Sequence, residues 1–260
     1  MSLYKYVIIL VCAFFLGCLS NKKKNLITSK TFETRLDSIN MFDSTRNRLI
    51  PVALYLPSTN MKIDHQQIVI LSHGYNVNRP GSNKGYSYLT TFLASKGYFV
   101  ASIQHELPTD DTIPLQGIPQ IVRRPFWERG AKNILFVLNE LKRIYPDLDY
   151  QHLILIGHSN GGDMSMLFGQ KYPTLADKIV SLDSRRVAFP RTKQPKIYSL
   201  RSCDQLADEG VLPTIEEQQK YGSQIIKLKH TIHNDMGDVG TAKQKREIND
   251  YILKFLSDNK

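Results

Sequence analysis

One short segment of the chain carries the pattern of an activated serine. Residues 157–161 read Gly-His-Ser-Asn-Gly, which fits G-x-S-x-G. The apolar run at 152–156 predicts a buried strand before it, and the pattern at 160–172 predicts a helix after it. A serine on a tight turn between a strand and a helix is presented for attack on a carbonyl carbon, and the flanking glycines avoid clashes with both elements. We therefore expect Ser159 to be a nucleophile.

A serine nucleophile needs a neighbouring base to take its proton. Two histidines follow the late strand that is predicted at 224–228: His230 lies at its end, and His233 lies in the loop beyond. We favour His233, because a loop gives the ring freedom to reach the serine, whereas a strand-end side chain is fixed to one face. A carboxylate must then orient the ring, and Asp204 and Asp183 each follow a predicted strand.

The elements that must position these residues alternate along the chain. Strands are predicted at 48–56, 68–71, 98–103, 152–156, 178–182, 196–200 and 224–228, and helices at 86–96, 127–145, 160–172 and 241–256. This alternation is typical of an α/β domain with a mostly parallel central sheet and helices on both faces. The connection at 184–195 is too short for a large lid, and the longest irregular stretch, 106–125, holds four prolines.

The strand-turn-helix context of Ser159, together with His73-Gly74-Tyr75 after an early strand, resembles the α/β-hydrolase superfamily over residues 48–256. Without a lid insertion, the chain looks like dienelactone hydrolases and lidless esterases within that superfamily. The resemblance implies a Ser, acid, His order, in which Asp204 has the commoner location of the acid. Asp183 is the alternative, at the position where platelet-activating-factor acetylhydrolases carry theirs.

The resemblance also implies the chemistry and the ligands of the site. The backbone N–H groups of Tyr75 and Asn160 are the expected oxyanion donors. Ester hydrolysis through a covalent acyl-enzyme is the expected activity, with a phospholipid or platelet-activating-factor-like esterase, or a catalytically silent binding protein of the cell envelope, as alternatives. Arg185, Arg186 and His105 are candidate substrate contacts, and the arginines favour an anionic ester. No cofactor is expected, and no residue pattern shows metal-ligand spacing.

The first residues predict export. Lys5 precedes an apolar run at 6–16, and Gly17-Cys18 follows before a polar, lysine-rich stretch. A small residue before cysteine resembles the lipobox of bacterial lipoproteins, so Cys18 is the expected lipid anchor. We therefore divide the chain into a signal peptide (1–18), a tether (19–30) and a hydrolase domain (31–260). The expected location is the cell envelope or periplasm, with secretion as the alternative.

The composition excludes several other classes of protein. Hydrophobic residues make up 42% of the chain and charged residues 22%, which is typical of a globular domain rather than a disordered or fibrous chain. The formal net charge is +10, but the basic residues are mixed with Asp and Glu, and no nucleic-acid-binding motif is present. A nucleic-acid partner is therefore not expected.

Overall fold

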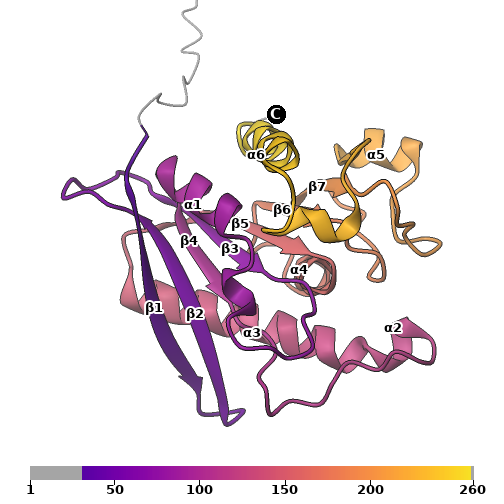
Figure 1. Ribbon diagram of the computed structural model, residues 1–260, viewed down its shortest axis with the longest axis horizontal. Coiled ribbons are helices and arrows are strands. Elements are labelled where there is room, and N and C mark those ends of the chain that lie inside the picture. The colour runs from indigo at the N-terminus through magenta and orange to yellow at the C-terminus, as the bar shows by residue number, and fades with distance from the viewer. Residues whose placement is uncertain (1–30, 259–260) are drawn as a thin grey trace, which may run out of the picture.

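An eight-stranded sheet forms the centre of the computed structural model, which describes residues 31–258 (Figure 1). The strand order is β1-β2-β4-β3-β5-β6-β7-β8. β2 runs antiparallel to both of its neighbours, β1 and β4, and every other pair of neighbouring strands is parallel. The strands are β1 (Thr34–Asp43), β2 (Arg48–Pro57), β3 (Gln67–Ser72), β4 (Phe99–Ile103), β5 (Asp149–His158), β6 (Lys178–Leu182), β7 (Lys196–Arg201) and β8 (Gln224–Lys227).

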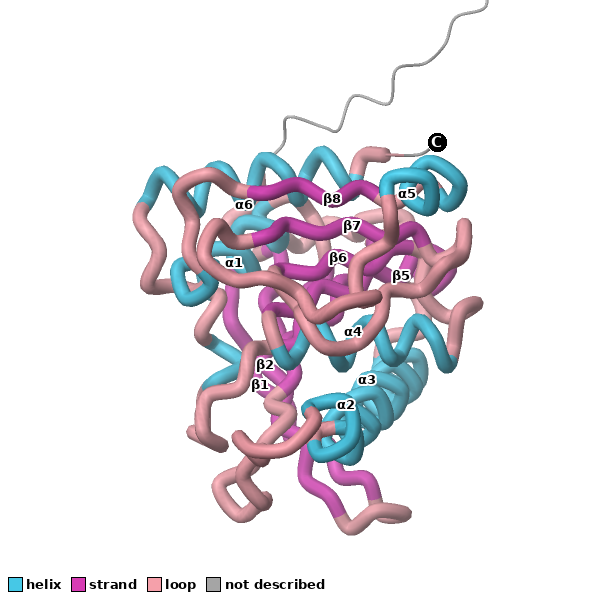
Figure 2. Tube along the Cα trace, turned by 90° about the vertical axis from the view of Figure 1, so that its right-hand side faces the viewer, coloured by secondary structure: helices cyan, strands magenta, loops and turns pink. Residues whose placement is uncertain are grey.

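Helices cover both faces of this sheet. One face packs against α1 (Ser87–Ser95) and α6 (Ala242–Leu256), and the other packs against α3 (Arg124–Ile144) and α4 (Asn160–Lys171). The short helices are η1 (Ser82–Lys84), α2 (Pro119–Val122), α5 (Ile215–Tyr221) and η2 (His233–Met236). Figure 2 shows β5, β6, β7 and β8 side by side in the sheet. The predicted α/β class, with a mostly parallel sheet and helices on both faces, is confirmed.

The central strands are buried from both sides. In β3, Ile68 and Ile70 belong to the core on the α3 and α4 face, while Val69 and Leu71 belong to the core on the α1 and α6 face. Side chains alternate between the two faces of a strand, so a strand that is covered on both faces is an unbroken apolar run. This is why such runs in the sequence predict the parallel strands correctly.

The structure adds elements that the sequence pattern does not reveal. β1 forms an antiparallel hairpin with β2 and lies at the edge of the sheet, where most of its side chains are exposed or half-buried. Its residues are therefore mostly polar, and the segment gives no apolar run. The short α5 and η2 were not predicted either. The connection from β6 to β7, residues 183–195, contains no helix or strand, in agreement with the expected absence of a large lid.

The predicted signal peptide and tether, with Cys18, lie outside the described residues. Within residues 31–258, none of the helices has the length and apolar character that a bilayer crossing requires.

Candidate active site

Ser159 occupies a strained turn between the end of β5 and the first residue of α4. Its backbone has φ 51° and ψ −119°, a conformation that residues with side chains rarely adopt. The flanking glycines are sterically required, because a Cβ on Gly161 would lie 2.2 Å from the Ser72 carbonyl oxygen and one on Gly157 would lie 2.4 Å from that of Gly161. The turn is thus closed tightly against β3, and the Ser159 hydroxyl lines a surface cavity.

The His233 ring bonds to that hydroxyl. His233 is the first residue of η2, in the loop after β8, and its Nε2 lies 3.0 Å from Ser159 Oγ. His230, the other candidate, lines a separate groove beside α6, and its backbone carbonyl accepts from the Gln244 side chain. The structure therefore brings together the serine and the histidine that the sequence favoured.

Asp183 completes the hydrogen-bonded chain. Its Oδ2 lies 2.5 Å from His233 Nδ1, and the side chain has no exposure to solvent. Burial alone would raise the pKa of Asp183, but the His233 ring, the Arg201 guanidinium at 2.8 Å and two hydrogen bonds from Ser202 together hold that pKa below its ordinary value. Asp183 is therefore an anion in direct contact with the His233 ring.

The prediction of Asp204 as the partner of the ring is wrong in this structure. Asp204 is exposed, and its Oδ1 accepts a hydrogen bond of 2.8 Å from the backbone N–H of His233. Asp183 follows directly at the end of β6, where a positive φ of 58° turns the chain sharply, whereas Asp204 lies beyond the end of β7 in an exposed turn. Asp204 thus fixes the backbone of the loop, and the alternative residue, Asp183, contacts the ring.

Of the two proposed oxyanion donors, Tyr75 lines the same cavity, whose volume is about 340 Å³, and Asn160 directly follows Ser159, which also lines it. Tyr75 lies in the loop after β3, and Asn160 begins α4, at the positive end of the helix dipole. No other group among residues 31–258 accepts a hydrogen bond from either backbone N–H. Both groups are therefore available to a ligand near Ser159, which is the arrangement that an oxyanion hole requires.

His158, the last residue of β5, links two loops of this site by hydrogen bonds. Its Nδ1 accepts from the Tyr86 hydroxyl at 2.7 Å, and its Nε2 donates to the carbonyl oxygen of His233 at 3.0 Å. Burial, with the nearby His233, lowers the pKa of His158 to about 3, so the ring is neutral and can make both bonds. Tyr86 in turn accepts from the Gly74 N–H at 3.1 Å. These bonds hold the loops that carry Gly74 and His233 against the end of β5, directly before Ser159.

None of the three predicted substrate contacts lines the cavity beside Ser159. The His105 ring is buried and bonds to the Ser72 hydroxyl at 2.9 Å. Arg186 forms an ion pair with Asp208, and Arg185 donates to the Gln205 side chain.

Arg79, which the sequence did not single out, does line this cavity. Its side chain has no ion-pair partner in the part of the chain that the structure describes. No signal in the sequence distinguishes Arg79 from other surface arginines, because its place depends on the path of the loop after β3.

A metal site has no support in this region of the molecule. Across the described residues there is no group of three or more His, Cys, Asp or Glu side chains that could hold a metal ion. Beside the cavity, Ser159, His233 and Asp183 are joined by hydrogen bonds through the two His233 ring nitrogens.

No family model matches the sequence. A Drosophila melanogaster protein named "Probable serine hydrolase" is 23% identical over 124 residues, which are 47% of this chain and 38% of that protein. The match thus spans well under half the length of that relative.

Among solved structures, the esterase Est22 superposes with a TM-score of 0.62 at 14% identity, covering 87% of this chain and 82% of that one. A bacterial heroin esterase superposes with a TM-score of 0.62 at 12% identity, covering 89% of this chain and 86% of that one. A dienelactone hydrolase-like promiscuous phosphotriesterase from metagenomic libraries superposes with a TM-score of 0.59 at 11% identity, covering 85% of this chain and 98% of that one. At such identities the likeness is one of architecture, and the chain has the α/β-hydrolase fold that these enzymes share.

Proposed function

We propose that this protein hydrolyses carboxylic esters through a Ser159-His233-Asp183 triad and a covalent acyl-enzyme. The observation that carries the proposal is the unbroken chain of hydrogen bonds from Ser159 Oγ through the two His233 ring nitrogens to the buried Asp183. Fold neighbours that are named esterases support a reaction at ester bonds. They do not identify the substrate.

The geometry supports the following sequence of steps. His233 Nε2 takes the Ser159 proton as Oγ attacks the ester carbonyl carbon, and the anionic Asp183 stabilises the resulting imidazolium. The backbone N–H groups of Tyr75 and Asn160 bind the oxyanion, each contributing about 3 kcal/mol in the transition state. His233 then gives the proton to the leaving alcohol. In the second half of the cycle it takes a proton from water, which attacks the acyl group, and then gives that proton to Ser159 Oγ as the acyl–oxygen bond breaks and the acid is released.

We further propose that the ester carries a negative charge. Among the described residues that line the cavity, Arg79 is the one permanently charged side chain, and no carboxylate lines the cavity with it. A guanidinium without an ion-pair partner favours a carboxylate or phosphate group on the substrate. The place of Asp183 also favours the platelet-activating-factor-like variant of the proposal, because the acid of those esterases lies at the same position, and their substrates carry a phosphate.

For the location of the protein, we propose export and attachment to the cell envelope through Cys18. The support is the order of a basic start, an apolar run and Gly17-Cys18 in the sequence. The membrane anchor would then keep the cavity outside the cytoplasm.

Replacement of the nucleophile tests the enzymatic proposal. We expect a fluorophosphonate probe to label the wild type and a Ser95→Ala control, but not Ser159→Ala, because the probe reacts with an activated serine. Hydrolysis of a short-chain aryl ester by Ser159→Ala should fall by at least about a thousandfold. Labelling of Ser159→Ala at the wild-type rate would exclude this serine as the nucleophile.

The two aspartates near His233 should differ sharply in their effects. Asp183→Asn should lower kcat by about a thousandfold or more, because the ring loses the anion that stabilises its charged form. Asp204→Asn should lower kcat by less than about tenfold, because an amide oxygen can still accept from the His233 N–H. Steady-state kinetics on one aryl ester decides the matter, and the reverse order of effects would contradict the assignment.

The charge of the substrate is tested at Arg79. Arg79→Ala should raise KM for an anionic aryl hemisuccinate about tenfold and leave KM for the neutral aryl acetate within twofold, since a charge-assisted hydrogen bond contributes about 1.5 kcal/mol or more. Arg79→Lys, which keeps the charge, should retain most of the preference. An equal change in KM for both esters would contradict the proposal that the substrate is anionic.

Attachment through Cys18 is tested by cell fractionation. In a bacterial host that processes lipoproteins, the wild type should be found with the membranes, and the intact mass of its N-terminal peptide should include acyl chains on Cys18. Cys18→Ser should release the protein to the soluble fraction or leave it unprocessed. Recovery of unmodified wild-type protein in the soluble fraction would argue against the anchor.

A further inference from the structure

A buried carboxyl group lies directly behind the nucleophile turn. Glu106 follows the end of β4 and is 1% exposed. Its Oε1 accepts a hydrogen bond of 3.0 Å from the side-chain amide of Asn160, the residue after Ser159. Its Oε2 has no hydrogen-bond partner among the described residues, and the nearest ring nitrogen, His73 Nε2, is 3.6 Å away and already accepts from the His105 N–H.

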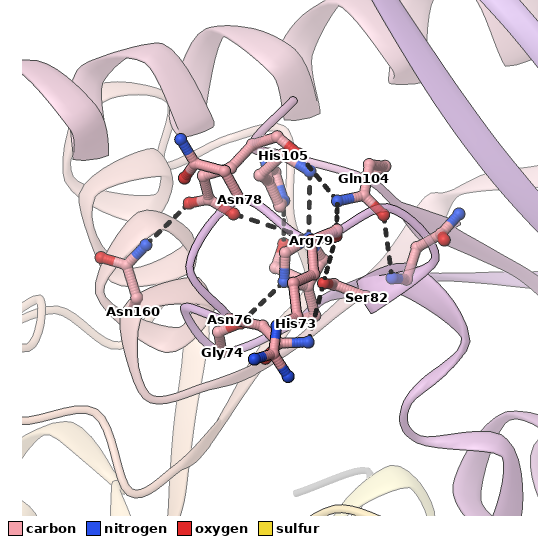
Figure 3. Close-up of polar contacts among 12 residues, drawn as sticks. His73, Gly74, Asn76, Asn78, Arg79, Ser82, Gln104, His105 and Asn160 are labelled. Atoms are coloured by element: carbon pink, nitrogen blue, oxygen red, sulfur yellow. Dashed lines mark hydrogen bonds and ion pairs between the residues drawn. The ribbon is translucent and has the colours of Figure 1, made fainter. Parts of the chain in front are cut away.

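Asn160 is held from its other side as well. Its Oδ1 accepts a hydrogen bond of 2.8 Å from the indole N–H of Trp127, a residue of α3 that is 2% exposed. Figure 3 shows the Asn160 side chain with its amide directed at this polar cluster, which also contains His73 and His105. The side chain of Asn160 is thus fixed at both of its polar atoms, while its backbone N–H at the start of α4 has no hydrogen-bond acceptor among residues 31–258.

Packing alone does not explain a carboxyl group at this position. Burial raises the pKa of Glu106 to about 7, with Arg129 and Arg48 acting in the opposite direction and Asp110 in the same one. A buried acid with one unpaired oxygen destabilises the folded state, and an apolar residue of similar size would avoid that loss. Among the described residues, the side-chain hydrogen bond that the carboxyl accepts comes from Asn160.

We propose that Glu106 is a positioning residue of the oxyanion hole, acting through its hydrogen bond to Asn160. The inference rests on the proposed ester hydrolysis, in which the Asn160 N–H binds the oxyanion. With its side chain anchored to Glu106 and Trp127, Asn160 keeps this N–H directed at the reacting carbonyl. An oxyanion exists only in the transition state and intermediate, so the loss of the anchor lowers kcat and leaves substrate binding almost unchanged.

Three variants on one aryl ester test this role. Glu106→Ala should lower kcat about tenfold or more with KM within twofold of the wild type. Glu106→Gln should restore kcat to within about twofold, because its amide oxygen can still accept from Asn160. Asn160→Ala keeps the backbone N–H but removes the other half of the bond, and it should lower kcat at least as much as Glu106→Ala. The double variant should be no slower than Asn160→Ala, because both changes remove the same contact.

A transition-state analogue separates positioning from stability. The inhibition constant of an aryl trifluoromethyl ketone, whose adduct carries an oxyanion, should rise in Glu106→Ala by the same factor as kcat falls. Lys178→Ala is the control, because Lys178 is a buried charged residue at the start of β6, at the opposite end of that strand from Asp183, where its Nζ donates to the Leu256 carbonyl oxygen. It should lower the melting temperature and leave both kcat and the inhibition constant unchanged.

Several results would overturn the inference without touching the proposed function. These are a wild-type kcat in Glu106→Ala, a Glu106→Gln variant as slow as Glu106→Ala, or strictly additive losses in the double variant. If Glu106→Ala does not fold, Glu106→Gln and Asn160→Ala still decide between the outcomes. Failure of the proposed function itself would be seen separately, as full activity in Ser159→Ala.

Discussion

Asp183 carries a negative charge in a position without access to solvent, and the polar groups of the neighbouring strands are arranged around that charge. Arg201, the last residue of β7, forms an ion pair with its carboxylate. Ser202, which follows β7, and the ring of His233 after β8 form hydrogen bonds with it. A buried anion is tolerated only when it is paired and fully hydrogen-bonded. The place of the ring, and through it the hydrogen bond to Ser159, follows from this requirement.

The sheet makes this arrangement possible, because parallel strands deliver their carboxyl ends to one edge. β6 and β7 pair in register, with Leu182 opposite Leu200, so that Asp183 and Arg201 leave the sheet side by side. The turn at Ser159 is fastened to the same edge by a hydrogen bond from its N–H to the Leu182 carbonyl. Backbone pairing thus holds together groups that are remote in sequence, and His158 links the flanking loops.

The sequence predicted those parts of the molecule in which a local pattern determines the structure. Fully buried strands such as β3 are short apolar runs, and Ser159 is marked by the glycines that its turn requires. It favoured Asp204 over Asp183, whereas Asp183 contacts the His233 ring. That contact depends on the backbone turn at the end of β6, and a positive φ at an aspartate leaves no pattern in the sequence. The contacts of Glu106 and Arg79 depend on loop paths, which are set by tertiary packing and were equally invisible.

The connection from β6 to β7 contains no helix or strand, and this affects the access of water to the site. In hydrolases with a mobile cover, opening and closing can limit turnover and can keep water from a reactive intermediate. Here residues 183–195 contain no helix or strand that could form such a cover. In the proposed cycle, an acyl group on Ser159 would then be open to water from the side of this connection, and water at its bulk concentration would compete well against an alcohol for that group.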